Sequence, residues 1–491
     1  MTTPSIAEDV ADIATRYLLD PPNGPEPVIN AASPSEVLEA FEATVGLGFG
    51  ENAKAHRTSD LRSAVDLVVG YSARTSHPRF MNQNFAGPDP VSVAGDWLGA
   101  ALNTTAATYE AAPVFTLMET AILHKLARFV GYPSRSAFGA DPAGIFCPGG
   151  STATLYGLQL ARHRRNPDMV KHGVGGEPQV IFVSESGHYS AVKSAILLGM
   201  GADAVVKVRC DESGAIDIQA FDEAVCRAKA GGLVPLAAIG TAGTTVTSAF
   251  DDLGSMADIC EREQMWFHVD GCYGGSALAS PRHAYRLSGV ERSDSMVWNL
   301  HKMMGATQQC TALLVRASGE LRSCFALEAD YLFQPDKQHG EYDLGDLSFQ
   351  CARRVDAFKA WLQWKTHGDE GMAERIDHAV ELADYARNQI QAGDGRFALI
   401  GGEFTNVVFL WVPPEYRPFG LTAASDEQRN EIHRLAPAIK AKMMADGGAM
   451  VGYQPVSGVN AFRILLMNPA VKPADIDAVL DLIDRCGNSV L

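Results

Sequence analysis

Lys302, Asp270 and His188 are the side chains of this 491-residue sequence whose types and settings could do chemistry. Lys302 stands beside His301 among apolar residues in WNLHKMMG (298–305). Because burying an ammonium group is costly unless its charge is compensated, this lysine either reaches out to water or is held in a covalent bond. Asp270 ends the apolar run WFHVD, and His188 in SESGHYS follows another such run. Each of the three could instead be structural, since a lone histidine usually is and a carboxylate often serves a turn.

The glycine-rich turn PGGSTATLYG (148–157) could bind a phosphate group. Its glycines are followed by Ser151 and Thr152, at the expected N-terminus of a helix. Free backbone amides and the positive end of the helix dipole attract anions at such a turn. Many helices begin this way with nothing bound, and the GxxxxGK[ST] spacing of nucleotide-binding P-loops is absent. On its own, the turn therefore indicates a phosphate site only weakly.

The elements that must position these residues alternate along the chain. Helical patterns such as TLYGLQLARHRR and AFDEAVCRAKA lie between short apolar runs. The expected strands are GIFC (144–147), QVIFVS (179–184), AVVKV (204–208), LAAIGT (236–241), WFHVD (266–270), SMVWN (295–299) and TALLVR (311–316). This alternation predicts an α/β fold whose central sheet is mostly parallel, with helices on both faces.

Three segments are expected to form the domains. Residues 1–90 mix helical periodicity (PSEVLEAFEATVGLG) with proline and glycine breaks, which predicts an N-terminal helical segment. Residues 91–370 form a large domain that ends in the long helical stretch CARRVDAFKAWLQWKTHG. Residues 371–491 form a smaller α/β domain, with HAVELADYARNQIQ and DIDAVLDLIDRC as helices and NVVFLWV as a strand.

Taken together, the turn at 148–157, Asp270 and Lys302 are the parts needed to hold pyridoxal phosphate. A helix N-terminus binds the phosphate, a lysine bonds the cofactor, and an acid pairs with the pyridine nitrogen. By keeping that nitrogen protonated, the acid lets the ring accept the electron pair left when a bond to the substrate α-carbon breaks. Each part follows an expected strand, and ligands of open α/β sheets bind at the carboxyl ends of strands. In this interpretation Lys302 is buried because it bonds the cofactor.

From about residue 71 to the C-terminus, the sequence resembles the group II pyridoxal-phosphate decarboxylases, and within them the animal-type glutamate and cysteine sulfinate decarboxylases. The resemblance runs through HPRFMNQNFAGPDP, TYEAAPVFTLME, GIFCPGGSTATLYG, SESGHYS, TAGTTVTSAFDD, HVDGCYGG, WNLHKMMG, YLFQPDKQ, DLGDLSFQCARRVDAFKAWLQWK, MVGYQP and NAFRILLMNPA. It implies a fold-type-I enzyme, like aspartate aminotransferase, that releases the α-carboxylate of an acidic L-amino acid as carbon dioxide. Family members are homodimers, so the resemblance also implies a homodimer, with the N-terminal segment in the contact.

The same resemblance assigns the cofactor-binding residues. Lys302 matches the lysine that bonds the cofactor, Asp270 the partner of the pyridine nitrogen, and His188 the imidazole stacked on the ring. Thr245 would lie beside the ring and His301 would contact the phosphate. The remaining matches to cofactor contacts are Gly150, Ser151, Thr152 and Asn299, the first three of them at the phosphate.

The resemblance also assigns residues to the substrate. Tyr342, in the mobile loop YLFQPDKQHGEYDLGD, matches a proton-donating tyrosine of the glutamate enzymes. Arg463, in AFRILL, matches an arginine that forms a salt bridge with a substrate carboxylate. Gln83 in the turn MNQNFAG matches a residue that contacts the acidic end of the substrate, and Phe85 in the same turn would shorten the pocket.

Departures from the family pattern leave the substrate open. Cys272 stands where the glutamate enzymes usually have alanine, which is either packing or a change that tunes the cofactor. Phe85 looks more like the cysteine sulfinate type, whereas the loop keeps Tyr342 as in the glutamate type and is one residue shorter. Ala107 stands where relatives usually carry an aromatic ring. Glutamate, aspartate, cysteine sulfinate and cysteate are all candidates. The alternatives are a decarboxylase of a non-acidic or specialised biosynthetic amino acid and a catalytically silent cofactor-binding protein.

Composition sets the remaining expectations. The net charge of −17 and the pI near 5.2 argue against binding of nucleic acid or of anionic membranes. No apolar stretch reaches the roughly 18 residues of a spanning helix. Nine scattered cysteines without a CxxC pair suit a reducing compartment, and the N-terminus carries acidic residues where a signal peptide carries basic ones. We therefore expect a cytoplasmic enzyme with an amino acid substrate and no metal site.

Overall fold

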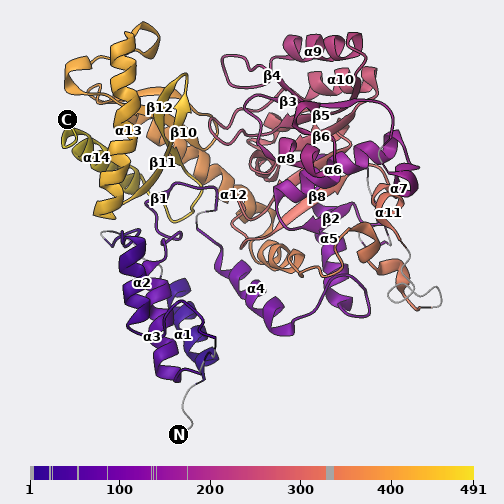
Figure 1. Ribbon diagram of the computed structural model, residues 1–491, viewed down its shortest axis with the longest axis horizontal. Helices are drawn as coiled ribbons and strands as arrows, with labels where there is room; N and C mark the ends of the chain where they lie inside the picture. Colours follow the sequence, from indigo (N-terminus) through magenta and orange to yellow (C-terminus); the bar gives the residue numbers. More distant parts are fainter. Residues whose placement is uncertain are drawn as a thin grey trace. The chain divides into compact units, whose positions relative to one another are not determined.

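The computed structural model describes residues 5–20, 24, 26–51, 53, 55–85, 87–133, 135–136, 138–139, 141–173, 175–327 and 337–491. Two compact units interleave along the chain (Figure 1). Unit 1 consists of residues 1–90, 381–400 and 407–491, and unit 2 of residues 91–380 and 401–406. The change from unit 2 to unit 1 falls inside α12 (Ala357–Ala392), a helix interrupted at Gly368 by a left-handed φ of 67°. The domain limits near residues 90 and 370 stay predictions.

A seven-stranded sheet forms the centre of unit 2, in the order β2-β8-β7-β6-β5-β3-β4. Neighbours from β4 to β7 run parallel, and β8 is antiparallel to both β7 and β2. The mostly parallel sheet predicted from the sequence is confirmed, and each expected apolar run forms a strand. The strands are β2 (Gly144–Cys147), β3 (Gln179–Ser184), β4 (Val205–Val208), β5 (Val234–Thr241), β6 (Trp266–Asp270), β7 (Ser295–Asn299) and β8 (Thr311–Val315).

Helices cover both faces of this sheet (Figure 1). Apolar side chains fill the space between α6 and the strands, Tyr156, Ile181 and Val297 among them. A sheet covered on both faces needs apolar residues at successive strand positions, which is why its strands are continuous apolar runs. One face carries α6 (Gly150–Arg165), α8 (Ser190–Leu197) and α11 (Glu320–Phe325), and the other carries α5 (Pro113–Val130), α9 (Ile218–Ala230) and α10 (Leu253–Glu263). Unit 2 also contains α7 (Met169–His172), and α4 (Pro90–Leu102) leads into it.

The parallel strands β3, β5, β6 and β7 end at one edge of the sheet. The register pairs Thr241 with Asp270 and Asp270 with Val297, so the ends of β5, β6 and β7 are neighbours. The segments that leave this edge carry His188, Thr245, Cys272, His301 and Lys302. The strand ends therefore set the place of the candidate residues, as expected for an open α/β sheet.

The long helix after residue 350 begins later than the sequence suggests. CARRVDAFKAWLQWKTHG predicts a helix from residue 351, but α12 starts at Ala357. The backbone of Arg353 is engaged by another segment: its N–H donates to Thr105 Oγ1 at 3.0 Å, and its carbonyl accepts from Ala106 N–H at 3.0 Å. Backbone groups satisfied in this way have no need of helical partners, which explains the late start.

A five-stranded sheet, in the order β1-β11-β12-β10-β9, forms the core of unit 1. Its first strand comes from the N-terminal segment and runs parallel to β11, with Phe80 opposite Met450. Two helices, α13 (Asp426–Asp446) and α14 (Pro473–Asn488), contribute Ile439 and Ile476 to the same apolar core. The strands are β1 (Phe80–Met81), β9 (Phe397–Gly401), β10 (Asn406–Trp411), β11 (Met450–Val456) and β12 (Val459–Leu465).

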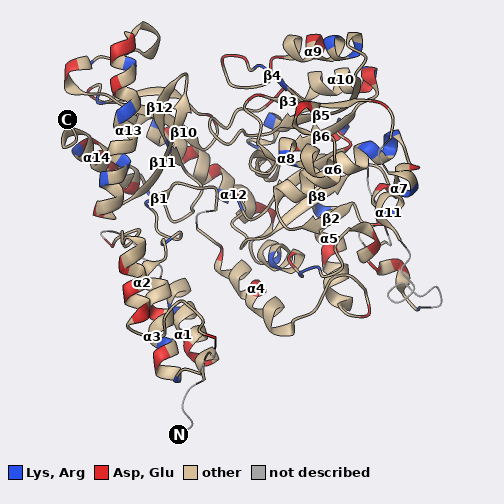
Figure 2. Cartoon of the chain, in the orientation of Figure 1, with Lys and Arg blue, Asp and Glu red and all other residues tan. Residues whose placement is uncertain are grey.

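The N-terminal helices α1 (Ile6–Leu19), α2 (Pro34–Glu42) and α3 (Thr58–Tyr71) bury little apolar surface in the single chain. Among their apolar side chains only Phe41 is fully buried, whereas Leu19 is 74% exposed. Figure 2 shows acidic residues along α2. None of the described helices combines the length and hydropathy needed to cross a bilayer.

Candidate active site at the carboxyl edge of the sheet

Lys302 lies in a tight turn directly after β7. Its N–H donates to the carbonyl of Asn299 at 3.1 Å, and its own carbonyl accepts from Gly305 N–H at 2.9 Å. Asn299 is held in turn, because its Oδ1 accepts from the Thr311 hydroxyl at 3.0 Å. The turn fixes the backbone of Lys302 while leaving its side chain half-buried at the sheet edge.

Asp270 ends β6 as a buried carboxylate, 7% exposed. Its Oδ1 accepts the backbone N–H of Cys272 at 3.0 Å. Burial by itself would raise the pKa of Asp270, but hydrogen bonding by Cys272 and the positive charge of Lys302 outweigh it, so the pKa of Asp270 is lowered. The site therefore holds an ionised carboxylate out of water and within range of the charge of Lys302.

His188 lies four residues beyond the end of β3, in the turn that opens α8. Its Nδ1 accepts the N–H of Ser190 at 3.2 Å, which fixes the direction of the ring. Burial lowers the pKa of His188, with Lys302 and Lys193 acting in the same sense and Asp270 opposing them. At neutral pH the side chain is therefore an uncharged planar ring within electrostatic range of Asp270 and Lys302.

The turn before α6 has the form of an anion site. Gly149 precedes the helix with a left-handed φ of 95°, and no side chain caps the helix N-terminus. A Cβ on Gly150 would lie 2.2 Å from Cys272 Sγ and 3.1 Å from Asn299 Nδ2, so only glycine fits there. Ser151 is exposed, and the Thr152 hydroxyl donates to the carbonyl of Pro148 at 3.2 Å. The first amides of α6 thus open toward the same edge as Asp270.

His301 and Thr245 flank this edge. Nδ1 of His301 lies 3.0 Å from the carbonyl oxygen and 3.1 Å from the amide nitrogen of Cys310, and burial lowers the pKa of His301 to about 4. Thr245 is exposed in the loop after β5, and its carbonyl accepts from Asn406 Nδ2 at 3.1 Å. Asn406 was not singled out in the sequence, because its contact with that loop spans 161 residues.

These residues fit pyridoxal phosphate. The uncapped helix N-terminus at Gly150 offers amides to a phosphate. Asp270 is ionised and buried, as the partner of a protonated pyridine nitrogen must be, and His188 supplies a neutral ring. Lys302 is close enough for its charge to lower the pKa of Asp270. The structure thus gathers at one edge the residues that the sequence analysis assigned to the cofactor.

Tyr342 belongs to the short 3-10 helix Gly340–Tyr342, and residues 328–336 of its loop lie outside the described residues. Its ring lies 5.6 Å from the ring of Tyr109. In the described part of the chain Tyr342 forms no hydrogen bond with Lys302 or Asp270, so a role as proton donor stays a prediction.

Asp343, the residue after Tyr342, is buried and held by hydrogen bonds. Asp343 accepts from the N–H of Tyr109 at 2.7 Å and from Lys337 Nζ at 3.0 Å, with its side chain only 2% exposed. Nearby, the carbonyl of Ala107 accepts from the amides of Leu344 and Gly345 at 3.0 and 2.8 Å. Ala107, which the sequence analysis treated as a lost aromatic ring, is thus the backbone anchor of this segment. Sequence patterns could not reveal that role, because any residue at 107 has the carbonyl.

Within unit 1, Arg463 contacts the turn that carries the other two predicted substrate residues, Gln83 and Phe85. It lies on β12, 7% exposed, and its Nη2 donates to the carbonyl of Asn82 at 2.7 Å. Gln83 is exposed in the same turn, and the Phe85 ring packs 5.8 Å from that of Phe80. Burial, followed by the positive charge of Arg463, lowers the pKa of Lys440 on α13. Unit 1 therefore holds Arg463 beside the 82–85 turn, with Lys440 within range of its positive charge.

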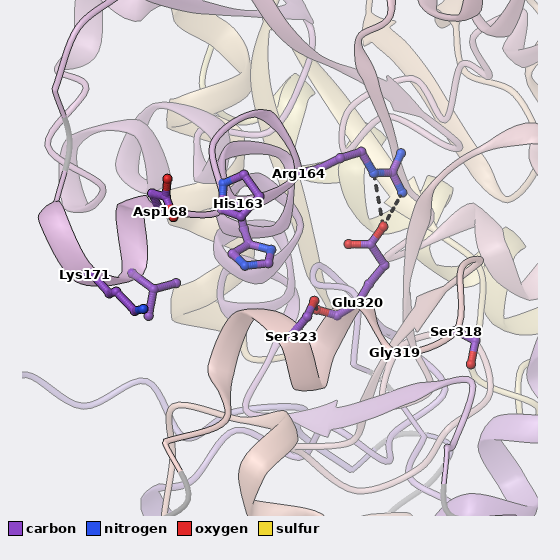
Figure 3. Close-up of a pocket in the computed structure, with 10 residues that line it drawn as sticks. His163, Arg164, Asp168, Lys171, Ser318, Gly319, Glu320 and Ser323 are labelled. Carbon is purple, nitrogen blue, oxygen red and sulfur yellow. Dashed lines mark hydrogen bonds and ion pairs between the residues drawn. The ribbon is translucent and has the colours of Figure 1, made fainter.

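A separate cavity of about 760 Å³ lies at the opposite end of α6 (Figure 3). His163, Asp168 and Lys171 line this cavity, and the Arg164 side chain forms an ion pair with Glu320 there. None of the sequence-predicted site residues lines it. The 16 residues of α6 span about 24 Å, so this cavity is far from Gly150. Its arginine is already neutralised, because Arg164 also pairs with Asp294 at 2.6 Å.

Comparison with known proteins agrees with this arrangement. A model of the pyridoxal-dependent decarboxylase conserved domain matches residues 50–412. The crystal structure of mouse cysteine sulfinic acid decarboxylase (CSAD) is 38% identical, with a TM-score of 0.91 over 98% of each chain.

Two further structures are more distant. The glutamate decarboxylase domain of diaminobutyrate-pyruvate transaminase and L-2,4-diaminobutyrate decarboxylase from Vibrio parahaemolyticus is 26% identical, with a TM-score of 0.81 over 99% of this chain and 95% of that one. Catharanthus roseus tryptophan decarboxylase shares the fold at 21% identity, with a TM-score of 0.84 over 99% and 98% of the two chains. The domain match and the likeness to the mouse enzyme lead to one conclusion: this chain belongs to the pyridoxal-dependent decarboxylase family and is a pyridoxal-phosphate-dependent amino acid decarboxylase.

Proposed function

We propose that this decarboxylase acts on an acidic L-amino acid and releases carbon dioxide and the corresponding amine. The observation that carries the proposal is Arg463, a buried arginine tied to the turn that holds Gln83 and Phe85. A guanidinium recognises a carboxylate or sulfinate by bidentate geometry as well as by charge. The 38% identity with mouse cysteine sulfinic acid decarboxylase supports the same class of substrate.

The cofactor would be held by residues of unit 2. The amides and hydroxyls of Gly150, Ser151 and Thr152, together with His301, would bind its phosphate, and Lys302 would bond it covalently. Asn299 would keep that turn in place and Thr245 would lie beside the ring. When bound, pyridoxal phosphate supplies an electron sink for the pair left on the substrate α-carbon.

Each remaining residue has one task in the reaction. Asp270 would hold the proton on the pyridine nitrogen, and the neutral ring of His188 would stack on the cofactor. Arg463 binds a substrate carboxylate, while Gln83 contacts the acidic end and Phe85 limits the length of the substrate. As carbon dioxide leaves, the phenol of Tyr342 delivers one proton to the α-carbon, so that hydrogen replaces the carboxylate.

We also propose that the enzyme is a cytoplasmic homodimer. Exposed apolar side chains, among them Leu19 on α1, Leu38 on α2 and Val68 on α3, form apolar stripes that bury little in the single chain, and a second copy would cover them. The nine cysteines, all of them free in the structure, suit a reducing compartment. Light scattering of the full chain, compared with a variant carrying Leu19→Asp and Leu38→Asp, tests the dimer, because charges in a covered stripe lower the dimer fraction. A parent enzyme that is monomeric at micromolar concentration rejects it.

The test of substrate class is carbon dioxide release from a panel of L-amino acids by the cofactor-loaded enzyme. Glutamate, aspartate, cysteine sulfinate and cysteate are compared with neutral and aromatic amino acids. Turnover confined to the acids supports the proposal. Turnover of a non-acidic amino acid instead identifies the alternative substrate class on the same scaffold, and silence on the whole panel with cofactor bound identifies a catalytically silent protein.

Replacement of Arg463 sharpens that test. Arg463→Met should raise KM for the acidic substrates by about 100-fold, the value of a charged bidentate hydrogen bond. Arg227→Met is a matched control, because the Arg227 side chain is 69% exposed on α9. If Arg463→Met leaves KM for the acids unchanged, Arg463 does not select the substrate.

A further inference from the structure

Two side chains of α12 hold the turn that follows Lys302. Nε2 of Gln363 donates to the carbonyl of Met304 at 2.6 Å, and Nε of Arg375 donates to the carbonyl of Met303 at 2.8 Å. Gln363 is 1% exposed, and so are Met303 and Met304. The two carbonyls that come next after Lys302 in the chain therefore each bind a donor from another element, as buried backbone oxygens require.

Arg375 also packs against Gly305, where the turn ends. Gly305 has a left-handed φ of 75°, and its N–H donates to the carbonyl of Lys302 at 2.9 Å. A Cβ on Gly305 would lie 2.5 Å from Cζ of Arg375, so the guanidinium lies directly on the backbone of the turn and only glycine fits there. The carbonyls of residues 302, 303 and 304 are therefore all bound, and the backbone from which the Lys302 side chain extends is fixed.

The break in α12 at Gly368 explains how both donors reach one turn. On a continuous α-helix, positions 363 and 375 would lie about 18 Å apart along the axis and about 120° apart around it. Their acceptors belong to consecutive residues, whose Cα atoms are only about 3.8 Å apart. Gly368 has a φ of 67° and a ψ of −174°, a conformation that is essentially restricted to glycine, and the two parts of α12 meet there at a kink. Gln363 therefore approaches the turn from the first part of the helix and Arg375 from the second.

We propose that Gln363 and Arg375 are positioning residues for Lys302: by holding the carbonyls of the turn, they fix the direction in which the lysine side chain reaches the cofactor. This inference rests on the proposed role of Lys302 as the residue that bonds pyridoxal phosphate. The ε-amine of Lys302 condenses with the cofactor aldehyde: a C=N bond forms, the C=O bond breaks, and its oxygen leaves as water. The rate of such a step depends on how the reacting atoms are aligned, since a displacement of about 1 Å can cost about 100-fold. Without its two donors the turn would hold Lys302 less closely, and the bond would form more slowly.

The test is the rate at which the apoenzyme forms this covalent bond once the cofactor is bound. Stopped-flow absorbance at saturating pyridoxal phosphate follows the band of the bond, so the first-order rate constant does not depend on affinity. Gln363→Met and Arg375→Met each remove a donor and should lower that constant about tenfold, the scale of one buried hydrogen bond. Arg375→Lys keeps a donor and should recover most of the loss. The matched controls are Gln389→Met and Arg227→Met, at exposed positions of α12 and α9.

Two results would overturn the inference: a rate constant that Gln363→Met and Arg375→Met leave unchanged, or a fall in rate that Arg375→Lys shows in full. Urea denaturation identifies a purely structural effect, because a general loss of stability lowers the unfolding midpoint without slowing the first-order step in folded molecules. If Arg375→Met does not fold, Gln363→Met decides the question alone. Lys302→Ala tests the premise: a covalent phase that survives in this variant means that another lysine bonds the cofactor, and the proposed role of Lys302 fails first.

Discussion

Arg353 and Glu119 form an ion pair in the interior of unit 2, with side chains only 2% and 1% exposed. The arginine also donates to the carbonyls of Ala106 and Phe146, and the carboxylate accepts the N–H of Phe146 at 2.9 Å. One buried pair therefore ties α5 to the strand that leads into the phosphate turn and to the segment that anchors residues 344 and 345.

We expect loss of one member of this pair to be strongly destabilising. Glu119→Gln or Arg353→Met leaves a buried charge without its partner, which should lower the free energy of unfolding by about 3–5 kcal/mol. Urea denaturation measures the change. The double variant with Glu119→Leu and Arg353→Met removes both charges and should lose less than either single variant. Single variants within 0.5 kcal/mol of the parent, the range of ordinary surface substitutions, would contradict the prediction.

Gly150→Ala should abolish cofactor binding. The added Cβ would meet Cys272 Sγ at 2.2 Å and displace the turn that offers amides to the phosphate. Equilibrium titration of the apoenzyme with pyridoxal phosphate measures the loss. Gly175→Ala is the control, because a Cβ on Gly175 meets nothing within 4 Å. Addition of Cys272→Ala to Gly150→Ala removes the clash and should restore part of the affinity for the cofactor. A double variant that binds the cofactor as weakly as Gly150→Ala would show that the clash with Cys272 is not the cause of the loss.

His268 should make the protein less stable as the pH falls from 6.5 to 4. Burial lowers the pKa of His268 from 6.5 to about 4. Between these two pH values the histidine is protonated in the unfolded chain but not in the folded chain, so protonation favours unfolding. Its contribution is complete above pH 6.5 and falls by about 3 kcal/mol by pH 4. His268→Asn cannot titrate, so its stability curve should be flatter, whereas the exposed His56→Asn should follow the parent. Equal slopes in parent and His268→Asn would refute the prediction.

Lys302→Ala should bind pyridoxal phosphate without a covalent bond and lose the absorbance band that belongs to the covalent bond between lysine and cofactor. Borohydride reduction of the parent, followed by peptide mass mapping, should find the cofactor on Lys302. Lys359 is the internal control, since it is a buried lysine of unit 2 already paired with Asp356 at 2.9 Å. A label on Lys359, or full absorbance in the variant, would remove Lys302 from its assigned role.

Tyr342→Phe should keep the cofactor but shift the products toward oxidative or transaminated side products, because the donor of the α-carbon proton is gone. The ratio of amine to carbonyl product measures this shift. Tyr109→Phe is the matched control, since the two rings lie 5.6 Å apart and only Tyr342 is assigned a proton. A Tyr342→Phe enzyme with the parent's product ratio would exclude the tyrosine from the reaction.

The strands of unit 2 could be predicted from the sequence because each is a short apolar run between helical patterns. Strands such as WFHVD and SMVWN begin and end where the sequence indicates. The first of these strands ends at Asp270, and Lys302 lies three residues beyond Asn299, the end of the second. Because ligands of open α/β sheets bind at the carboxyl ends of strands, the sequence alone predicts that these residues lie together. Chemistry placed at strand ends is thus accessible to sequence analysis.

Contacts between distant segments were not accessible in the same way. Arg463 meets Asn82 across 381 residues, and Arg353 meets Glu119 across 234. Neither partner has a sequence pattern that indicates the other, because both contacts depend on the completed fold.

The parallel pairing of β1 with β11 has a consequence for the order of folding. Phe80 leaves the ribosome long before Met450, its neighbour in the sheet, so the sheet of unit 1 cannot be completed until nearly the whole chain has been made. Unit 2 is almost continuous in sequence and needs only residues 401–406 from beyond α12. Cotranslational folding thus begins in the large unit, and the sheet that carries Arg463 is completed last. A truncated product would hold the cofactor-binding residues without the substrate arginine.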